Sequence, residues 1–226
     1  MTIALESNDL IQSGYLVWLI VAYVAYIATG ALPSDKQPFR KPPLRVLVDR
    51  LGFFIAFFAL PLLVFTLAGW SMPGYASLGM GEPMRWLAPT LGISALAFAI
   101  GFFAKKGPAE LGNYPQYLPA RWGAGKIALE LVSWSLYLYA YEFVFRGFLL
   151  YALLPLGTGL AIVAQTGLYA FAHLPKSAKE AGAAVIFGIA TAIMTLAWGT
   201  ILPAFIVHLA LALANDLSCF RAMKRA

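Results

Sequence analysis

The sequence predicts an all-α integral membrane protein, a polytopic bundle of about seven transmembrane helices in a single domain that covers 1–226. Apolar residues make up 61% of the chain and charged residues 12%, about half of the roughly 25% typical of soluble domains. A soluble domain of this size lacks the interior to bury so much apolar surface. The apolar residues also form runs near the 20 residues that cross a bilayer as a helix. A disordered chain, a coiled coil and, with Cys219 as the only cysteine, a disulfide-rich domain are excluded.

Seven segments have the length and composition of transmembrane helices. They are approximately 14–32, 51–69, 86–104, 127–154, 157–173, 181–198 and 200–219. The fourth is too long for one straight span, so either its start near Lys126 lies along the interface or the segment breaks. The last two are separated by almost no chain, which predicts a tight helical hairpin. Because lipid tolerates no irregular backbone, and the alternation of a membrane β-barrel is missing, these segments are expected to be helices.

Basic residues predict the orientation of these helices in the inner (plasma) membrane. Most of the 16 lysines and arginines fall in alternate loops, at 33–50, 105–126 and 174–180, and in the C-terminal tail. The positive-inside rule then places the N-terminus outside and the C-terminus in the cytoplasm. The N-terminal residues have no basic region of the kind that opens a cleavable signal peptide, so the first span is expected to stay as an anchor. The basic loop 33–50 indicates contact with anionic lipid, and no nucleic-acid partner is expected.

Ionisable side chains inside the predicted spans are costly, and they gather in spans four, five and seven. They are Glu130, Glu142, Arg146, His173, His208 and Asp216. Glu142 and Arg146 are four residues apart, so a helix places both on one face. The spacing fits either a structural ion pair, which lets both charges survive in lipid, or a site in which the arginine orients the carboxylate.

The chain has two histidines, and both lie in these spans. His173 comes just before Pro175, near a helix end, where an imidazole is often only a partner of the helix dipole. His208 lies in an Ala- and Leu-rich helix and needs a polar partner there; Asn215, seven residues on, shares nearly the same face. One glutamate and two histidines can polarise a water, with the carboxylate as base and the imidazoles as oxyanion stabilisers or metal ligands.

Three motifs in order resemble the CAAX-protease and bacteriocin-processing family of intramembrane proteases (CPBP, or ABI). The family's first motif has two glutamates, three residues and an arginine; its second has phenylalanine, three residues and histidine; its third has histidine, three residues and asparagine or aspartate. The matching residues here are Tyr141-Glu142-Phe143-Val144-Phe145-Arg146-Gly147, Tyr169 with His173, and His208. The resemblance covers a CPBP-like core at about 127–217, and the segment before it matches by hydropathy only.

The resemblance implies a glutamic-type endopeptidase with a conical cavity open to the cytoplasm, which cleaves membrane-associated or lipidated peptides. In that reading Glu142 activates water, Arg146 orients the carboxylate, and His173 and His208 bind the oxyanion. Asn215 or Asp216 would position the histidines without contacting the substrate. No cofactor is implied; zinc held by the glutamate and the two histidines is the alternative.

Two positions depart from the family pattern. Tyr141 replaces the first glutamate, the catalytic base of the family, and a phenol with a pKa near 10 is a poor base at neutral pH. Ala212 stands where the third motif has asparagine. Either Glu142 serves as the base, or the protein is an inactive pseudo-protease that acts as a scaffold, chaperone or accessory subunit of a membrane complex. Glu142 would also lie about 24 Å from Lys126 along a helix, so it meets His173 only if span four tilts or begins along the interface.

Overall fold

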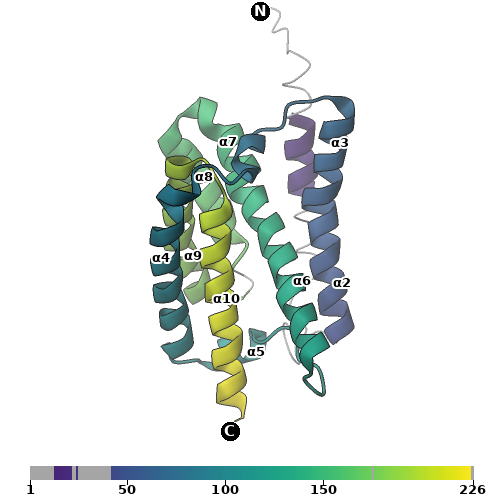
Figure 1. The fold of residues 1–226 in the computed structure, drawn as a ribbon, viewed down its shortest axis with the longest axis vertical. Helices are drawn as coiled ribbons and strands as arrows, with labels where there is room; N and C mark the ends of the chain where they lie inside the picture. Colours follow the sequence, from purple (N-terminus) through teal and green to yellow (C-terminus); the bar gives the residue numbers. More distant parts are fainter. Residues whose placement is uncertain (1–12, 22–23, 25–41, 175, 225–226) are drawn as a thin grey trace, which may run out of the picture.

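The structure is a computed structural model that describes residues 13–21, 24, 42–174 and 176–224. The described chain is helical and contains no strand (Figure 1). Five helical segments are long and apolar enough to cross a membrane, which confirms the predicted polytopic helical bundle. Their bounds are Pro43–Ala68, Pro83–Phe103, Ala124–Leu156, Ala178–Trp198 and Leu202–Met223.

Two of these segments join several helical elements end to end. The first consists of α2 (Pro43–Phe54), the π-helical η1 (Ile55–Ala59) and α3 (Leu60–Ala68), and it ends at Gly69, whose left-handed φ of 66° closes the helix. The third consists of α6 (Ala124–Glu142), the π-helical η3 (Phe143–Leu149), α7 (Leu150–Leu153) and the 3-10 turn η4 (Leu154–Leu156). The predicted fourth span is therefore one continuous, inclined helix (Figure 1).

The remaining elements are α4 (Pro83–Phe103), α8 (Thr158–Phe171), α9 (Ala178–Trp198) and α10 (Leu202–Met223), with the short η2 (Tyr75–Leu78) and α5 (Pro108–Asn113) in the connections. The predicted hairpin of the last two spans is present, since α9 ends at Trp198, the left-handed Gly199 follows directly, and α10 begins at Leu202. The predicted segment 14–32 lies mostly outside the described residues, of which 13–21 are helical.

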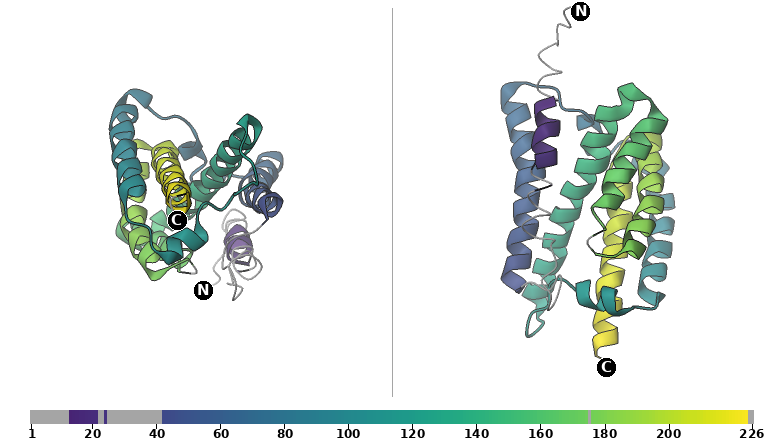
Figure 2. Two further views of the ribbon diagram at one scale, coloured as in Figure 1. Left: turned by 90° about the horizontal axis from the view of Figure 1, so that it is seen from below. Right: turned by 180° about the vertical axis from the view of Figure 1, so that it is seen from behind.

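The predicted segment 157–173 differs from a full span. It corresponds to α8, which has only 14 residues and so is about 21 Å long, short of the roughly 30 Å hydrocarbon core. The turn between α8 and α9 consequently ends short of the lower ends of α6 and α10 (Figure 2). This turn carries His173 into the depth of the bundle.

Small residues let the helices approach closely. At Gly101 a side-chain carbon would lie 3.0 Å from the Cβ of Ala214, where α4 crosses α10. At Gly188 it would lie 2.9 Å from Thr166, where α9 packs on α8. Small-residue contacts of this kind are a common way to pack helices in lipid. The inner face of the bundle carries a cluster of aromatic rings that includes Tyr141 and Tyr169.

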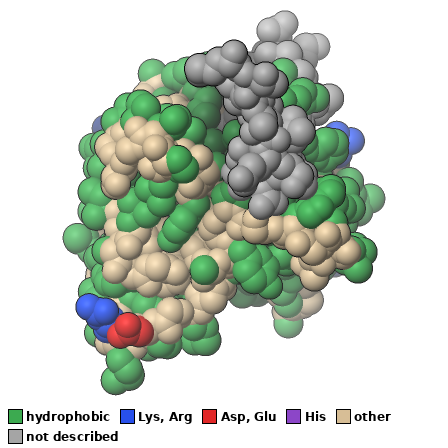
Figure 3. All heavy atoms as spheres, turned by 90° about the horizontal axis from the view of Figure 1, so that it is seen from above, with side chains coloured by type: hydrophobic (Ala, Val, Ile, Leu, Met, Phe, Trp, Pro, Cys, Tyr) green, Lys and Arg blue, Asp and Glu red, His purple; other side chains and the backbone are tan. Residues whose placement is uncertain are grey.

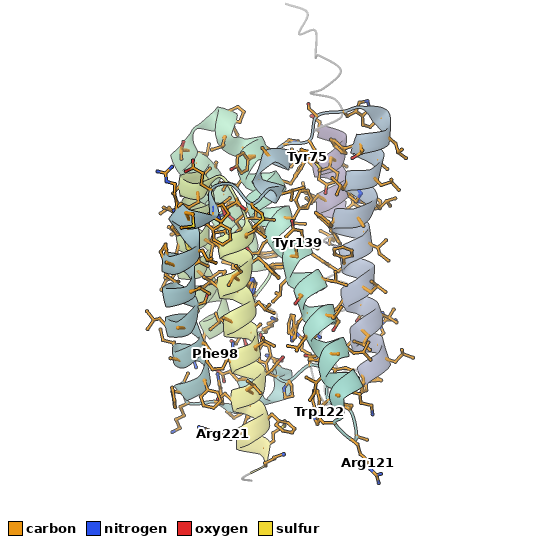
Figure 4. All side chains as sticks on the ribbon, viewed as in Figure 1. Tyr75, Phe98, Arg121, Trp122, Tyr139 and Arg221 are labelled. Atoms are coloured by element: carbon orange, nitrogen blue, oxygen red, sulfur yellow. The ribbon has the colours of Figure 1, made fainter. Side chains whose placement is uncertain are left out.

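The two ends of the bundle differ in charge. The end viewed in Figure 3 is covered mainly by hydrophobic and uncharged atoms, with few charged side chains. Arg121 and Arg221 lie at the opposite end, where the chain terminates (Figure 4).

Candidate active site

Glu142 and Arg146 lie where α6 passes into the wider π-helical turn η3. Both side chains are completely buried, and Arg146 Nη1 lies 3.0 Å from Glu142 Oε2. The ion pair that their spacing suggested is therefore present. The guanidinium also stacks over the ring of Tyr169, with 4.0 Å from its central carbon to the ring centroid. Aromatic faces stabilise a desolvated cation, so the arginine is held by one carboxylate and the ring beneath it.

His208 reaches the same carboxylate from α10. Its Nδ1 lies 2.6 Å from Glu142 Oε1. A carboxylate oxygen accepts hydrogen bonds, so Nδ1 is assigned the proton and donates it to Glu142. The two oxygens of Glu142 thus face two different partners, His208 and Arg146.

His173 follows the end of α8, in the turn that leads to α9. Its Nδ1 lies 2.8 Å from the backbone carbonyl of Tyr169. A carbonyl can only accept, so this Nδ1 carries the proton, and in the neutral ring Nε2 carries the lone pair. Within the described part of the chain no hydrogen bond joins His173 to Glu142.

A cavity of about 320 Å³ opens beside these residues. His173, His208 and Tyr141 line it, whereas Glu142 and Arg146 do not. Consecutive residues of a helix point about 100° apart. Tyr141 therefore faces the cavity. Glu142 lies behind His208 and does not line the cavity. The charged residues of the lining are Asp49, Arg50, Lys105, Lys106, Glu110, Lys176, Lys179 and Glu180.

The ring of Tyr141 lies near both imidazoles. The centroid of its ring lies 6.2 Å from that of His173 and 5.9 Å from that of His208. Its side chain is buried among further aromatic rings, including that of Tyr169 at 5.6 Å. The position of the family's first glutamate thus lies on the cavity lining near both histidines, and here an aromatic ring occupies it.

The two polar residues after His208 have separate surroundings. Asn215 lines the cavity, and its Oδ1 accepts a hydrogen bond from Lys106 Nζ at 2.7 Å. Burial lowers the pKa of Lys106 from its ordinary value. Asp216 faces away from the cavity and accepts a hydrogen bond from Trp134 Nε1 at 2.7 Å. Asp216 is therefore not in contact with either histidine, and Ala212 leaves an apolar wall beside His208.

At the rim of the cavity, polar contacts join α5 to the start of α9. Lys179 Nζ lies 2.7 Å from Glu110 Oε1, and this hydrogen bond lowers the pKa of Glu110 below its usual 4.5. The hydroxyl of Tyr114 donates to Glu180 at 3.1 Å. Burial raises the pKa of Tyr114 well above 10, so it remains a neutral donor.

The structural role of Arg50, at the end of the basic loop 33–50, was not predicted from the sequence. Arg50 is only 3% exposed. Its Nη1 and Nη2 donate hydrogen bonds to the two carboxylate oxygens of Glu130, at 2.8 and 3.2 Å. These residues are 80 positions apart, so no local spacing indicated the pair. The one available signal was that Glu130, an acid inside a predicted span, needs a partner there.

The histidines are not part of a clustered metal-ligand set in the described residues. No three His, Cys, Asp or Glu side chains there are grouped so as to hold a metal ion. A site with Glu142, His173 and His208 as three ligands would need a rearrangement, because Glu142 lies behind His208 and His173 bonds to a backbone carbonyl.

The fold and the site define a class: a polytopic helical membrane protein with a buried carboxylate–imidazole–guanidinium cluster beside an internal cavity. The comparison with known families is consistent with this class. Residues 123–214 match the family described as Type II CAAX prenyl endopeptidase Rce1-like. The match confirms the resemblance seen in the motifs, over the segment that carries Glu142, Arg146, His173 and His208. Searches of curated proteins and of solved structures find no match to the chain.

Proposed function

We propose that this protein is an intramembrane peptidase of the Rce1-like type, in which His173 and His208 act on a membrane-associated or lipidated peptide. The observation that carries the proposal is that both imidazoles line the same cavity. Each has its Nδ1 hydrogen-bonded to an oxygen that only accepts, Tyr169 O or Glu142 Oε1. This arrangement leaves Nε2 of each ring for the reaction.

The proposed chemistry divides the two histidines into a base and a donor. Nε2 of neutral His173 removes a proton from a water, and the water oxygen attacks the scissile carbonyl. Nε2–H of protonated His208 donates to the oxyanion, while Glu142 stabilises that imidazolium through Nδ1–H. His173 then returns its proton to the leaving nitrogen as the C–N bond breaks. Glu142 and Arg146 are positioning residues here, a different role from the water activation that the resemblance implies for Glu142.

We also propose that the cavity opens to the cytoplasm in an inner (plasma) membrane protein. Lysines line its rim, and the positive-inside rule assigns such residues to the cytoplasmic side. The inner part of the cavity is aromatic, with Tyr137, Tyr141 and Phe187 on its wall. An apolar or lipidated segment suits this inner part, and a soluble peptide end suits the rim.

The test compares new peptide N-termini in membranes from an expression host by mass spectrometry. The host makes the wild-type protein, His173→Ala, His208→Ala or Glu82→Gln, the last being an exposed carboxylate far from the cavity. General acid–base groups typically contribute about 10²–10⁴-fold, so both histidine variants should lose at least about 100-fold of the product. Glu82→Gln should cleave like the wild type. Full product with His173→Ala, or no wild-type-dependent product at all, would overturn the proposal.

A second candidate function is a pseudo-protease that binds a membrane protein without cutting it. The observation that favours it is Tyr141, which fills the wall position of the family's first glutamate. Purification after cross-linking distinguishes the two candidates. A partner that is retained at one-to-one stoichiometry, intact in length and equally bound by the wild type and His208→Ala, favours the pseudo-protease. A partner that is intact only with His208→Ala favours the peptidase.

A further inference from the structure

A second cavity lies beside the lower parts of α6 and α10, and it shares no lining residue with the first. Its volume is about 460 Å³, within the roughly 300–1,000 Å³ of small-molecule sites. Figure 4 shows Phe98 and Trp122, two of its lining residues, on either side of the lower half of α10. Most of the lining is apolar: Phe98, Pro115, Trp122, Ile127, Leu131, Leu213, Leu217 and Phe220.

This second cavity, the α6–α10 groove, is open to the lipid. Ile127 and Leu131 on α6 and Leu217 on α10 are each between 43% and 50% exposed. Apolar side chains exposed to this degree on candidate spans are in contact with acyl chains. An acyl chain can therefore enter the groove sideways from the bilayer.

The groove has the length of one leaflet of the bilayer. Its lining residues on α10 run from Leu213 to Lys224, a rise of about 16 Å at 1.5 Å per residue. This rise is close to half of the roughly 30 Å hydrocarbon core. Lys224 follows Met223, the last residue of α10, and Trp122 lies at the same end of the bundle. Lysine and tryptophan side chains are typical of the headgroup level, so the groove extends from the headgroups toward the middle of the bilayer.

The two acidic residues of the groove, Glu130 and Asp216, are balanced within the protein. Glu130 accepts two hydrogen bonds from the guanidinium of Arg50. Asp216 is hydrogen-bonded to Glu130, and a hydrogen bond between two carboxyl groups requires one proton. One proton and one guanidinium therefore balance both acids. The buried part of the groove is neutral and does not repel an anionic ligand.

Lys224 adds an uncompensated positive charge at the headgroup end of the groove. Its Nζ lies 4.5 Å from the centroid of the Phe220 ring. Lys126 and Arg121, each adjacent in sequence to a lining residue, are exposed near the same end. None of these three cations forms an ion pair with a carboxylate of the described residues. The apolar groove thus ends at a cationic mouth at headgroup level.

We propose that the α6–α10 groove binds one anionic phospholipid from the adjoining leaflet. One acyl chain lies along the apolar side chains, and the phosphate of the headgroup contacts Lys224, with Lys126 and Arg121 adding to the positive field. A zwitterionic headgroup carries its own ammonium, which offsets this attraction, so a headgroup with net negative charge binds more tightly. The proposal is independent of the proposed peptidase activity.

The test compares phosphatidylglycerol with phosphatidylcholine of the same acyl chains. Native mass spectrometry of the purified full-length protein measures the binding of each lipid. A basic residue near the membrane surface contributes about fivefold to the affinity for anionic lipid. Phosphatidylglycerol should therefore bind as one copy per protein and at least about fivefold more tightly than phosphatidylcholine. Equal affinities would overturn the proposal, and so would displacement of the lipid by glycerol phosphate, which has the phosphate without the chains.

Three variants locate the site. Lys224→Gln removes the charge from an exposed position and should lower the affinity for phosphatidylglycerol about fivefold, whereas Lys224→Arg should keep it. Lys105→Gln is the matched control, because Lys105 is exposed at the same end of the bundle and does not line the groove. Leu217→Trp fills the groove from a half-exposed position and should lower phosphatidylglycerol binding at least as much as Lys224→Gln. Equal losses in Lys224→Gln and Lys105→Gln, or unchanged binding in Leu217→Trp, would overturn the assignment.

Discussion

Glu142 separates His208 from Arg146: one carboxylate oxygen lies 2.6 Å from the imidazole Nδ1 and the other 3.0 Å from the guanidinium. The carboxylate is thus shared between a group on α10 and a group on its own helix. Its two partners explain how a fully buried acid survives in the bundle. Through these two contacts Glu142 links α10 to the helix that contains η3.

The first prediction concerns the contribution of Glu142 to the free energy of unfolding. Glu142→Gln removes the charge that balances Arg146, and breaking a buried pair by removing one partner costs about 3–5 kcal/mol. The unfolding free energy in detergent, measured with denaturant, should fall by that amount. Glu82→Gln, in an exposed pair, should change it by less than about 1 kcal/mol. Similar losses for both variants would show that Glu142 is not needed to balance the arginine.

The second prediction concerns the link between α2 and α6. Arg50→Lys keeps the charge but loses the paired hydrogen bonds to Glu130 and the stacking on Trp134, because an ammonium is a point donor. We expect a loss of about 2 kcal/mol or more, a typical value for hydrogen bonds to charged groups. Arg45→Lys, whose partner Asp49 is near the surface, is the control and should lose less than about 0.5 kcal/mol. Equal thermal stability of the two variants would contradict a structural role for Arg50.

The third prediction concerns a close approach beside the site. Gly74 and Gly69 both have left-handed backbones, with φ of 69° and 66°. A side-chain carbon on Gly74 would overlap the carbonyl oxygen of Gly147 in η3, whereas nothing lies within 4 Å of one on Gly69. Gly69→Ala should cost only the backbone strain, about 1–2 kcal/mol. Gly74→Ala should cost clearly more and displace η2 from η3, which comparison of the two melting temperatures will test.

The fourth prediction concerns pH at the rim. The pKa of Glu110 is depressed by the hydrogen bond from Lys179, so this tie contributes stability above the usual pKa of 4.5. The contribution is lost as the pH falls through the depressed value. In Lys179→Ala the carboxyl of Glu110 should titrate at a higher pH, as followed by ¹³C NMR of labelled glutamate. In Lys105→Ala, which removes an exposed lysine of the same rim, it should titrate as in the wild type.

Local patterns in the sequence predicted the long helices and one contact of the site. Runs of apolar residues located five spans, and the four-residue spacing of Glu142 and Arg146 indicated their ion pair. Both depend on helical periodicity, which a sequence displays directly. The family motifs added the order of the histidines, and the family match covers the same segment.

Contacts between distant segments were not predictable in this way. The bond of His208 to Glu142 joins residues 66 positions apart, and Asp216 turned out to face Trp134 instead of the histidines. The π-helical turn at 143–149 was not predicted, because no residue in it signals a wider turn. The position of His173 relative to the membrane depends on the length of α8. Hydropathy alone predicted a full span there, whereas α8 has only 14 residues.

The shortness of α8 has a consequence for the surrounding membrane. A helix of about 21 Å cannot match a hydrocarbon layer of about 30 Å, so lipids beside it must shorten or tilt at a modest free-energy cost. We expect the bilayer to be locally thin on the α8 side, with headgroups and water drawn inward toward the turn that bears His173. A transmembrane segment that diffuses to this face would meet polar surroundings earlier along its length than elsewhere. Hydrophobic mismatch would then favour unwinding of its end beside the cavity.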